Sequence, residues 1–105
     1  MAILNSTQDE YQISEGVVYR IRPSVANIRQ SVHITGTGSV NLRGCVQIPT
    51  SINDPILTLD ESDTKISGFK EFKQALVNYI KFEENQAGTR VITIKGFAQP
   101  IPLQF

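Results

Sequence analysis

Two side chains of this sequence, His33 and Cys45, are of the types that serve as general base and nucleophile in enzymes. Each is the single residue of its type in the 105-residue chain. His33 lies between Val32 and Ile34 in an alternating run, which places it on the opposite face of a strand from both. Because catalytic and metal sites need several converging groups, we interpret His33 as a surface or interface residue and Cys45 as a small core residue.

Two further motifs could bind ions. Gly36-Thr37-Gly38 has two glycines of a phosphate-binding loop, but a strand pattern follows where that loop requires a helix. Asp60-Glu61-Ser62-Asp63 could offer carboxylates to calcium, but it lacks the spacing and the glycine of an EF-hand. We interpret the first as a turn and the second as a solvated loop. The sequence therefore predicts no catalytic, cofactor-binding or metal-binding residue, and we expect a protein that is not an enzyme.

Charge and composition narrow the classes of partner. Ten basic residues balance ten acidic residues, so the formal net charge is zero. Nucleic-acid-binding proteins usually carry a basic excess, and we expect no nucleic-acid partner. No apolar run approaches the roughly 20 residues that span a bilayer, and the first residues do not resemble a signal peptide. We expect no membrane partner. A single cysteine gives no disulfide framework, which favours assembly in a reducing cytoplasm.

Alternating apolar and polar residues predict that the first half of the chain is built of β-strands. The predicted strands are Val17–Arg22, Val32–Thr35, Ser39–Arg43, Cys45–Ile48 and Ile56–Leu59. Because only Gly36-Thr37-Gly38 separates the second run from the third, we expect these two to form a β-hairpin. The Pro-, Ser- and Asp-containing stretch from Pro49 to Pro55 predicts a loop.

The segment after Gly68 allows two interpretations. Five apolar residues fall at helical spacing, namely Phe69, Phe72, Leu76, Tyr79 and Ile80. Against a helix, residues 79–82 alternate, and the β-branched run Thr89–Lys95 is the strongest strand signal in the chain. We favour a loop or short helical turn over Phe69–Leu76, followed by a hairpin of Asn78–Glu84 with Thr89–Lys95. A helix over Phe69–Ile80 is the alternative.

Together these elements predict a mostly β protein, a single antiparallel β-sandwich or barrel-like domain with at most one short helix and extended terminal arms. We place the domain over residues 1–96 and an extended apolar C-terminal arm over residues 97–105. Pro100 and Pro102 prevent a helix there and remove backbone donors at alternate positions. An extended apolar segment is expected to occupy a groove on its own domain or on a neighbour, and we expect the domain to stay folded without it.

Residues that could contact a partner come from two places in the sequence. Arg20, Arg22, Arg29 and Arg43 could form a basic stripe, but the balance of charge favours pairing with carboxylates at a protein interface. The arm adds apolar side chains. The candidate partner-binding residues are Arg20, Arg22, Phe97, Ile101, Leu103 and Phe105. A sugar-binding platform would depend on Tyr11, Tyr19 and Tyr79, and nothing in the sequence indicates that these form one flat face.

The order of these elements resembles the small β-sandwich proteins that decorate or cement the virions of tailed bacteriophages. The resembling segments are Val18–Ile21, Ile34–Val40, Tyr79–Phe82 and Val91–Lys95. The likeness extends with gaps from Val17 to Lys95; it departs over Phe69–Leu76 and does not include the C-terminal arm.

This resemblance implies a structural protein of the virion without an active site, which binds and reinforces the assembled shell. Its implied partners are the major capsid protein or another virion protein and further copies of itself, with a homotrimer favoured. A tail, neck or head-fibre component of a phage is one alternative. A sugar-binding β module is a second.

Overall fold

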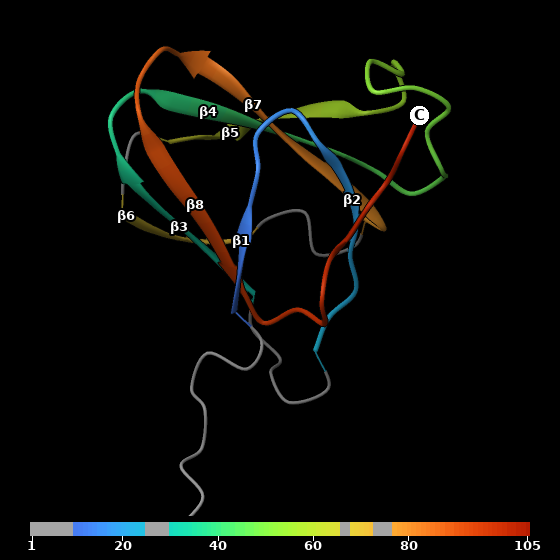
Figure 1. Cartoon of the computed structure of the whole chain (residues 1–105), viewed down its shortest axis with the longest axis horizontal. Helices are drawn as coiled ribbons and strands as arrows, with labels where there is room; N and C mark the ends of the chain where they lie inside the picture. Colours follow the sequence, from blue (N-terminus) through green and yellow to red (C-terminus); the bar gives the residue numbers. More distant parts are fainter. Residues whose placement is uncertain (1–9, 25–29, 66–67, 73–76) are drawn as a thin grey trace, which may run out of the picture.

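The computed structural model describes residues 10–24, 30–65, 68–72 and 77–105. In this part of the chain there are nine β-strands and no helix, arranged in two antiparallel sheets that pack together (Figure 1). The strands are β1 (Glu10–Ile13), β2 (Val18–Arg20), β3 (Ser31–Gly36), β4 (Ser39–Cys45), β5 (Thr58–Lys65), β6 (Gly68–Glu71), β7 (Tyr79–Gln86), β8 (Arg90–Lys95) and β9 (Ile101–Pro102). The prediction of a mostly β sandwich is confirmed.

Each sheet contributes alternate residues to a shared core. One sheet has the strand order β1-β8-β3-β6, and the other has the order β5-β4-β7-β2-β9. In the first sheet Val32 pairs with Ile94 and Ile34 with Ile92, and all four side chains are buried. The second sheet adds a matching set to the same cluster, namely Tyr19, Val40, Leu42, Ile80 and Phe82. The period of two thus places one face of each strand inside.

The two predicted hairpins are wrong, although their strands exist. β3 and β4 lie in different sheets, and so do β7 and β8. The observed pairs are β3 with β8 and β4 with β7. The Gly36–Gly38 segment is therefore a corner at which the chain leaves one sheet for the other, with positive φ angles of 113° at Gly36 and 80° at Gly38. Glycine adopts such angles without strain, and a bend between sheets uses them as readily as a hairpin turn does.

Both interpretations of the segment after Gly68 also require correction. Gly68–Glu71 forms β6 on the edge of the first sheet, where a loop or short helical turn was predicted from Phe69 onward, and Tyr79 and Ile80 begin β7. A helix over Phe69–Ile80 is therefore wrong at both of its ends, while residues 73–76 lie outside the described part. Phe72 follows β6 and enters the core. Its ring meets that of Phe97 edge to face, with centroids 4.9 Å apart.

Three predicted boundaries differ in the second sheet. β2 is limited to Val18–Arg20, where Val17–Arg22 was predicted. β4 ends at Cys45 and β5 begins at Thr58, so residues 46–57 form a loop, although strands were predicted at Cys45–Ile48 and Ile56–Leu59. The acidic run that starts at Asp60 lies within β5 rather than in a loop.

The C-terminal segment lies along its own domain (Figure 1). Phe97 is 1% exposed and belongs to the core, so the packing unit continues past residue 96. β9 pairs with β2, and the N–H of Leu103 donates to the carbonyl oxygen of Val18 at 2.8 Å. The segment is extended, as the prolines require, and it pairs with the edge of the second sheet of its own chain.

Candidate functional site

The two residues with catalytic side chains lie in different sheets. The ring of His33 faces outward and stacks on Phe69 of the neighbouring strand, with centroids 4.2 Å apart and planes 7° from parallel. Cys45 is buried against Val18 and Leu57, as predicted for a core residue. Burial raises the pKa of the Cys45 thiol, and the charge of Asp54 raises it further. A thiol of raised pKa stays protonated and is a poor nucleophile.

Other sites that the sequence suggested are not assembled by the described residues. Among them no group of three or more His, Cys, Asp or Glu side chains could hold a metal ion. Tyr19 is buried with its hydroxyl bonded to the N–H of Ser14, whereas Tyr11 and Tyr79 pack against separate clusters. The three tyrosines therefore form no common platform. In residues 10–24, 30–65, 68–72 and 77–105 we also find no helix of the length and apolarity needed to cross a membrane.

The loop between β4 and β5 carries an exposed group of aliphatic side chains. We call Val46, Ile48, Ile52 and Ile56 the apolar loop patch. Their exposed fractions are 58%, 62%, 38% and 39%, respectively. Val46 and Ile56 line a common hollow of about 440 Å³ beside Cys45. Single exposed aliphatic residues are ordinary on a protein surface, but four in one loop offer apolar area that a partner can bury.

A buried lysine holds this loop against the second sheet. The side chain of Lys81, in β7, is 6% exposed and reaches the loop between β4 and β5. Its ammonium group donates to the carbonyl oxygen of Ile52 at 2.7 Å and to Oδ1 of Asn53 at 3.2 Å. It also pairs with Oε2 of Glu83 at 3.0 Å. All three ammonium protons thus have acceptors, as a buried charge requires.

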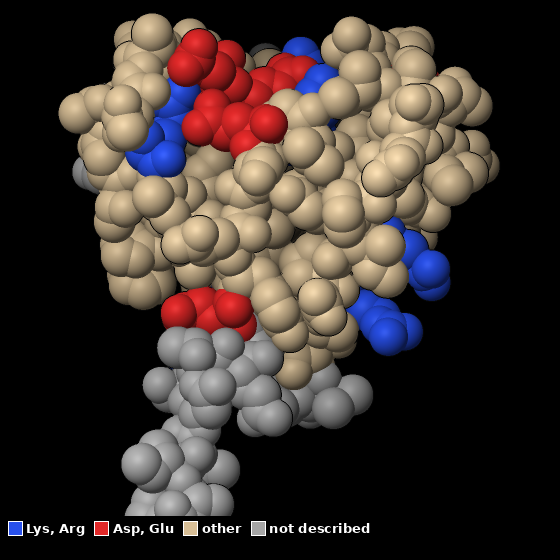
Figure 2. All heavy atoms as spheres, in the orientation of Figure 1, with Lys and Arg blue, Asp and Glu red and all other residues tan. Residues whose placement is uncertain are grey.

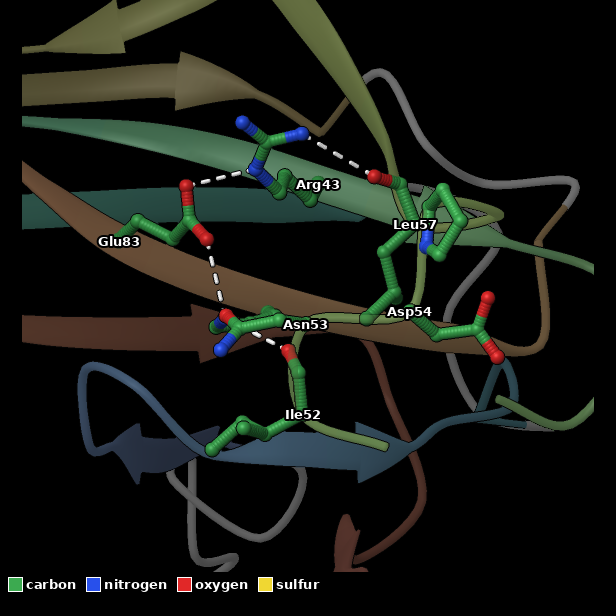
Figure 3. A pocket seen from close by; sticks show the side chains of 8 residues that line it. Arg43, Ile52, Asn53, Asp54, Leu57 and Glu83 are labelled. Carbon is green, nitrogen blue, oxygen red and sulfur yellow. Dashed lines mark hydrogen bonds and ion pairs between the residues drawn. The ribbon is translucent and has the colours of Figure 1, made fainter. Parts of the chain in front are cut away.

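Arg43 completes the charged cluster from the next strand. Its Nε donates to Oε1 of Glu83 at 2.6 Å, and Nη1 donates to the carbonyl oxygen of Leu57 at 3.1 Å (Figure 3). Burial by itself raises the pKa of Glu83, but the hydrogen bonds and charges of Arg43 and Lys81 together outweigh it, and the net pKa is lowered. Glu83 is therefore ionised at neutral pH and links two cations that lie opposite each other in the sheet.

Asp54 fixes the loop from within. Its carboxylate accepts hydrogen bonds from the N–H and hydroxyl of Thr50, at 2.7 and 2.9 Å, and from the N–H of Ile56 at 3.0 Å. These bonds lower the pKa of Asp54. Together Arg43, Lys81, Asp54 and Glu83 surround a polar pocket of about 230 Å³ under the loop. Because every charged group of the pocket has local partners, we interpret it as the support of the apolar loop patch.

The candidate partner-binding residues are distributed unequally between core and surface. Phe97 is buried and offers no surface to a partner. Leu103 is half-buried against Val18, Cys45 and Leu57. The remaining four, Arg20, Arg22, Ile101 and Phe105, are exposed. Arg43 of the supposed basic stripe pairs with Glu83 of its own chain, and Arg29 lies outside the described residues.

The apolar loop patch was not anticipated from the sequence. Its signal was four aliphatic residues within a segment otherwise rich in turn-forming residues, a pattern that a solvated loop does not need. The role of Lys81 had no local signal, since alternation puts it on the polar face of its strand. The sequence matches no protein-family model, and neither a curated protein nor a solved structure matches the chain.

Proposed function

We propose that this chain is a non-enzymatic structural protein that docks on a larger protein assembly through the apolar loop patch. The observation that carries the proposal is the exposure of four aliphatic side chains on a loop fastened by Lys81 and Asp54. A fastened loop loses little conformational entropy when a partner covers it, which favours binding. Burial of its exposed aliphatic area supplies the driving force.

The choice of assembly rests on the resemblance to phage decoration and cement proteins. We propose the assembled shell of a tailed bacteriophage as the surface, with the major capsid protein as the partner and a virion as the location. A protein that reinforces a shell needs rigid contact surfaces and no reactive groups, and a protonated, buried Cys45 fits this role. Zero formal net charge leaves little long-range repulsion between neighbouring copies.

Co-sedimentation with phage heads that lack the chain tests this proposal. The purified full chain should sediment with assembled heads and not with isolated capsid subunits. A Val46→Ser/Ile48→Ser variant should bind the heads about tenfold more weakly, since two exposed aliphatic side chains lose part of their burial. The matched control is Val91→Ser, because Val91 is 45% exposed on the other sheet. Equal binding to heads and subunits, or equal weakening by the control, would overturn the proposal.

A further inference from the structure

Two arginines lie together at the end of β2, away from the apolar loop patch along the chain. Arg20 and Arg22 are separated by Ile21, which is buried, so that both arginines project to the outer face. Both are exposed, and with Gln99 and Ile101 they line a shallow hollow of about 60 Å³. Ile101 stands directly opposite Arg20 in the register of β2 and β9 and is 51% exposed.

These two arginines differ from Arg43 and Arg90 in their partners. Arg43 pairs with Glu83, and Arg90 pairs with two carboxylates, Glu15 and Glu84. No ion pair or side-chain hydrogen bond joins the guanidinium groups of Arg20 and Arg22 to another residue in the described ranges. Figure 2 shows acidic and basic side chains side by side at the top of one face, whereas the basic side chains at its lower right have no acidic neighbour in view.

The strand beside these arginines cannot accept a partner strand through a regular ladder. The N–H of Leu103 points to β2, and alternation directs the N–H of Ile101 the same way. The positions between and before them, Pro102 and Pro100, would face outward but have no N–H to offer. Recognition at this edge therefore depends on side chains, namely the two guanidinium groups and the aliphatic side chain of Ile101.

We propose that Arg20, Arg22 and Ile101 form a second docking surface, for a protein segment that presents carboxylates next to an aliphatic side chain. The inference rests on the proposed function and names the chemistry of one contact. Guanidinium groups bind carboxylates through paired hydrogen bonds, and Arg20 and Arg22 would not have to give up an ion pair with any described residue to do so. Nucleic acid fits less well, because two cations neutralise few phosphates and Ile101 would face a charged backbone.

Amide chemical shifts of the full chain, followed by NMR, test this surface. The probe is a short synthetic peptide in which glutamate and leucine alternate. We expect shifts at Arg20, Arg22 and Ile101, about fivefold weaker binding by an Arg20→Gln/Arg22→Gln variant, and weaker binding in high salt. Lys95→Gln is the control, because Lys95 belongs to the other sheet. It should leave the affinity unchanged.

Three outcomes would overturn the inference. They are the absence of shifts at these residues, an equal loss of affinity in the control, and tighter binding of oligothymidylate than of the peptide. A peptide in which lysine replaces glutamate should not bind. None of these results bears on the apolar loop patch, whose residues are unaltered in all variants, so this inference and the proposed function fail separately.

Discussion

The backbone N–H of Thr37 donates to the carbonyl oxygen of Thr89 at 2.8 Å, and the N–H of Thr89 donates to the hydroxyl oxygen of Thr37 at 3.0 Å. Thr37 lies in the corner between β3 and β4, and Thr89 lies in the corner between β7 and β8. The two places where the chain changes sheet are thus bonded to each other. Since β3 pairs with β8 and β4 with β7, these bonds join the two corners that connect the sheets.

This contact predicts that Gly36→Ala destabilises the protein by about 2 kcal/mol. A Cβ at Gly36 would overlap the carbonyl oxygen of Thr89, and its φ angle of 113° is unfavourable for alanine. Gly88→Ala should also destabilise, since its Cβ would overlap the carbonyl of Thr37. Urea unfolding measures both effects.

Gly16→Ala separates the effect of an unfavourable φ angle from the effect of a steric overlap. Gly16 has a φ angle of 77°, but a Cβ there would meet no atom within 4 Å. We expect a loss of about 1 kcal/mol, from the φ angle alone. A loss at Gly36 no greater than that at Gly16 would contradict the close approach of the two corners.

Glu83 predicts a dependence of stability on pH. Its folded-state pKa lies below the unfolded value, so its contribution is fully present above the unfolded pKa and is lost as the pH falls through the folded pKa. At neutral pH, Glu83→Gln should cost about 2 kcal/mol, because Lys81 and Arg43 both lose a carboxylate. The difference in free energy of unfolding between the two proteins should shrink in acid.

Glu84→Gln is the control for this titration. Its side chain is 54% exposed, and Arg90 retains Glu15 when Glu84 is neutral. We expect a loss below about 1 kcal/mol for such an exposed pair. Parallel curves of stability against pH for Glu83→Gln and the unaltered chain would contradict the prediction.

Phe97 predicts that the end of the chain is needed for folding. Phe97→Ala should cost about 3 kcal/mol, because the ring is buried against Phe72. Truncation after Gly96 should destabilise at least as much, whereas Phe105→Ala should change little, since Phe105 is 58% exposed. Thermal unfolding compares the three proteins, and a domain of unchanged stability after truncation would restore the idea of a separate arm.

Pro100, which precedes β9, and Pro102, which lies within it, lead to a fourth prediction. Replacing Pro100 and Pro102 by threonine supplies two N–H groups at the edge of the second sheet, where Pro102 is exposed, and an unpaired edge is a template for another strand. Sedimentation velocity should then show concentration-dependent species larger than those of the unaltered chain. Gln104→Thr, which adds no backbone donor, serves as the control. Identical sedimentation of the proline variant would mean that the edge is protected by something else.

Local patterns in the sequence predicted the strands, whereas contacts between distant residues decide how the strands pair. Alternation placed Val32, Ile34, Ile92 and Ile94 in the core, because the period of two is a local property of a strand. The sheet to which a strand belongs depends on contacts with residues far away in the sequence. Gly36-Thr37-Gly38 has the composition of a hairpin turn, and only the contact with Thr89 makes it a corner.

The candidate partner-binding surfaces likewise include residues that the sequence predicted and residues whose place depends on distant contacts. Arg20, Arg22 and Ile101 were predicted as partner-binding residues, and they are exposed and adjacent. Whether they bind a partner remains a prediction. Lys81 could not have been found, because its burial depends on a loop that lies about thirty residues earlier and folds over the outer face of β7. Phe97 was assigned to an arm because its partner, Phe72, is likewise distant in sequence.

The pairing of the outermost strands has a consequence for synthesis of the protein. Glu10 of β1 pairs with Lys95, and Tyr19 of β2 pairs with Pro102, so these strands meet partners that the ribosome makes more than eighty residues later. Such long-range pairing makes folding slow, because the chain loses conformational entropy on closing a long loop before the contacts that compensate for this loss can form. Until then the apolar faces of the early strands stay uncovered on the nascent chain, and a chaperone that holds it there should raise the yield of folded protein.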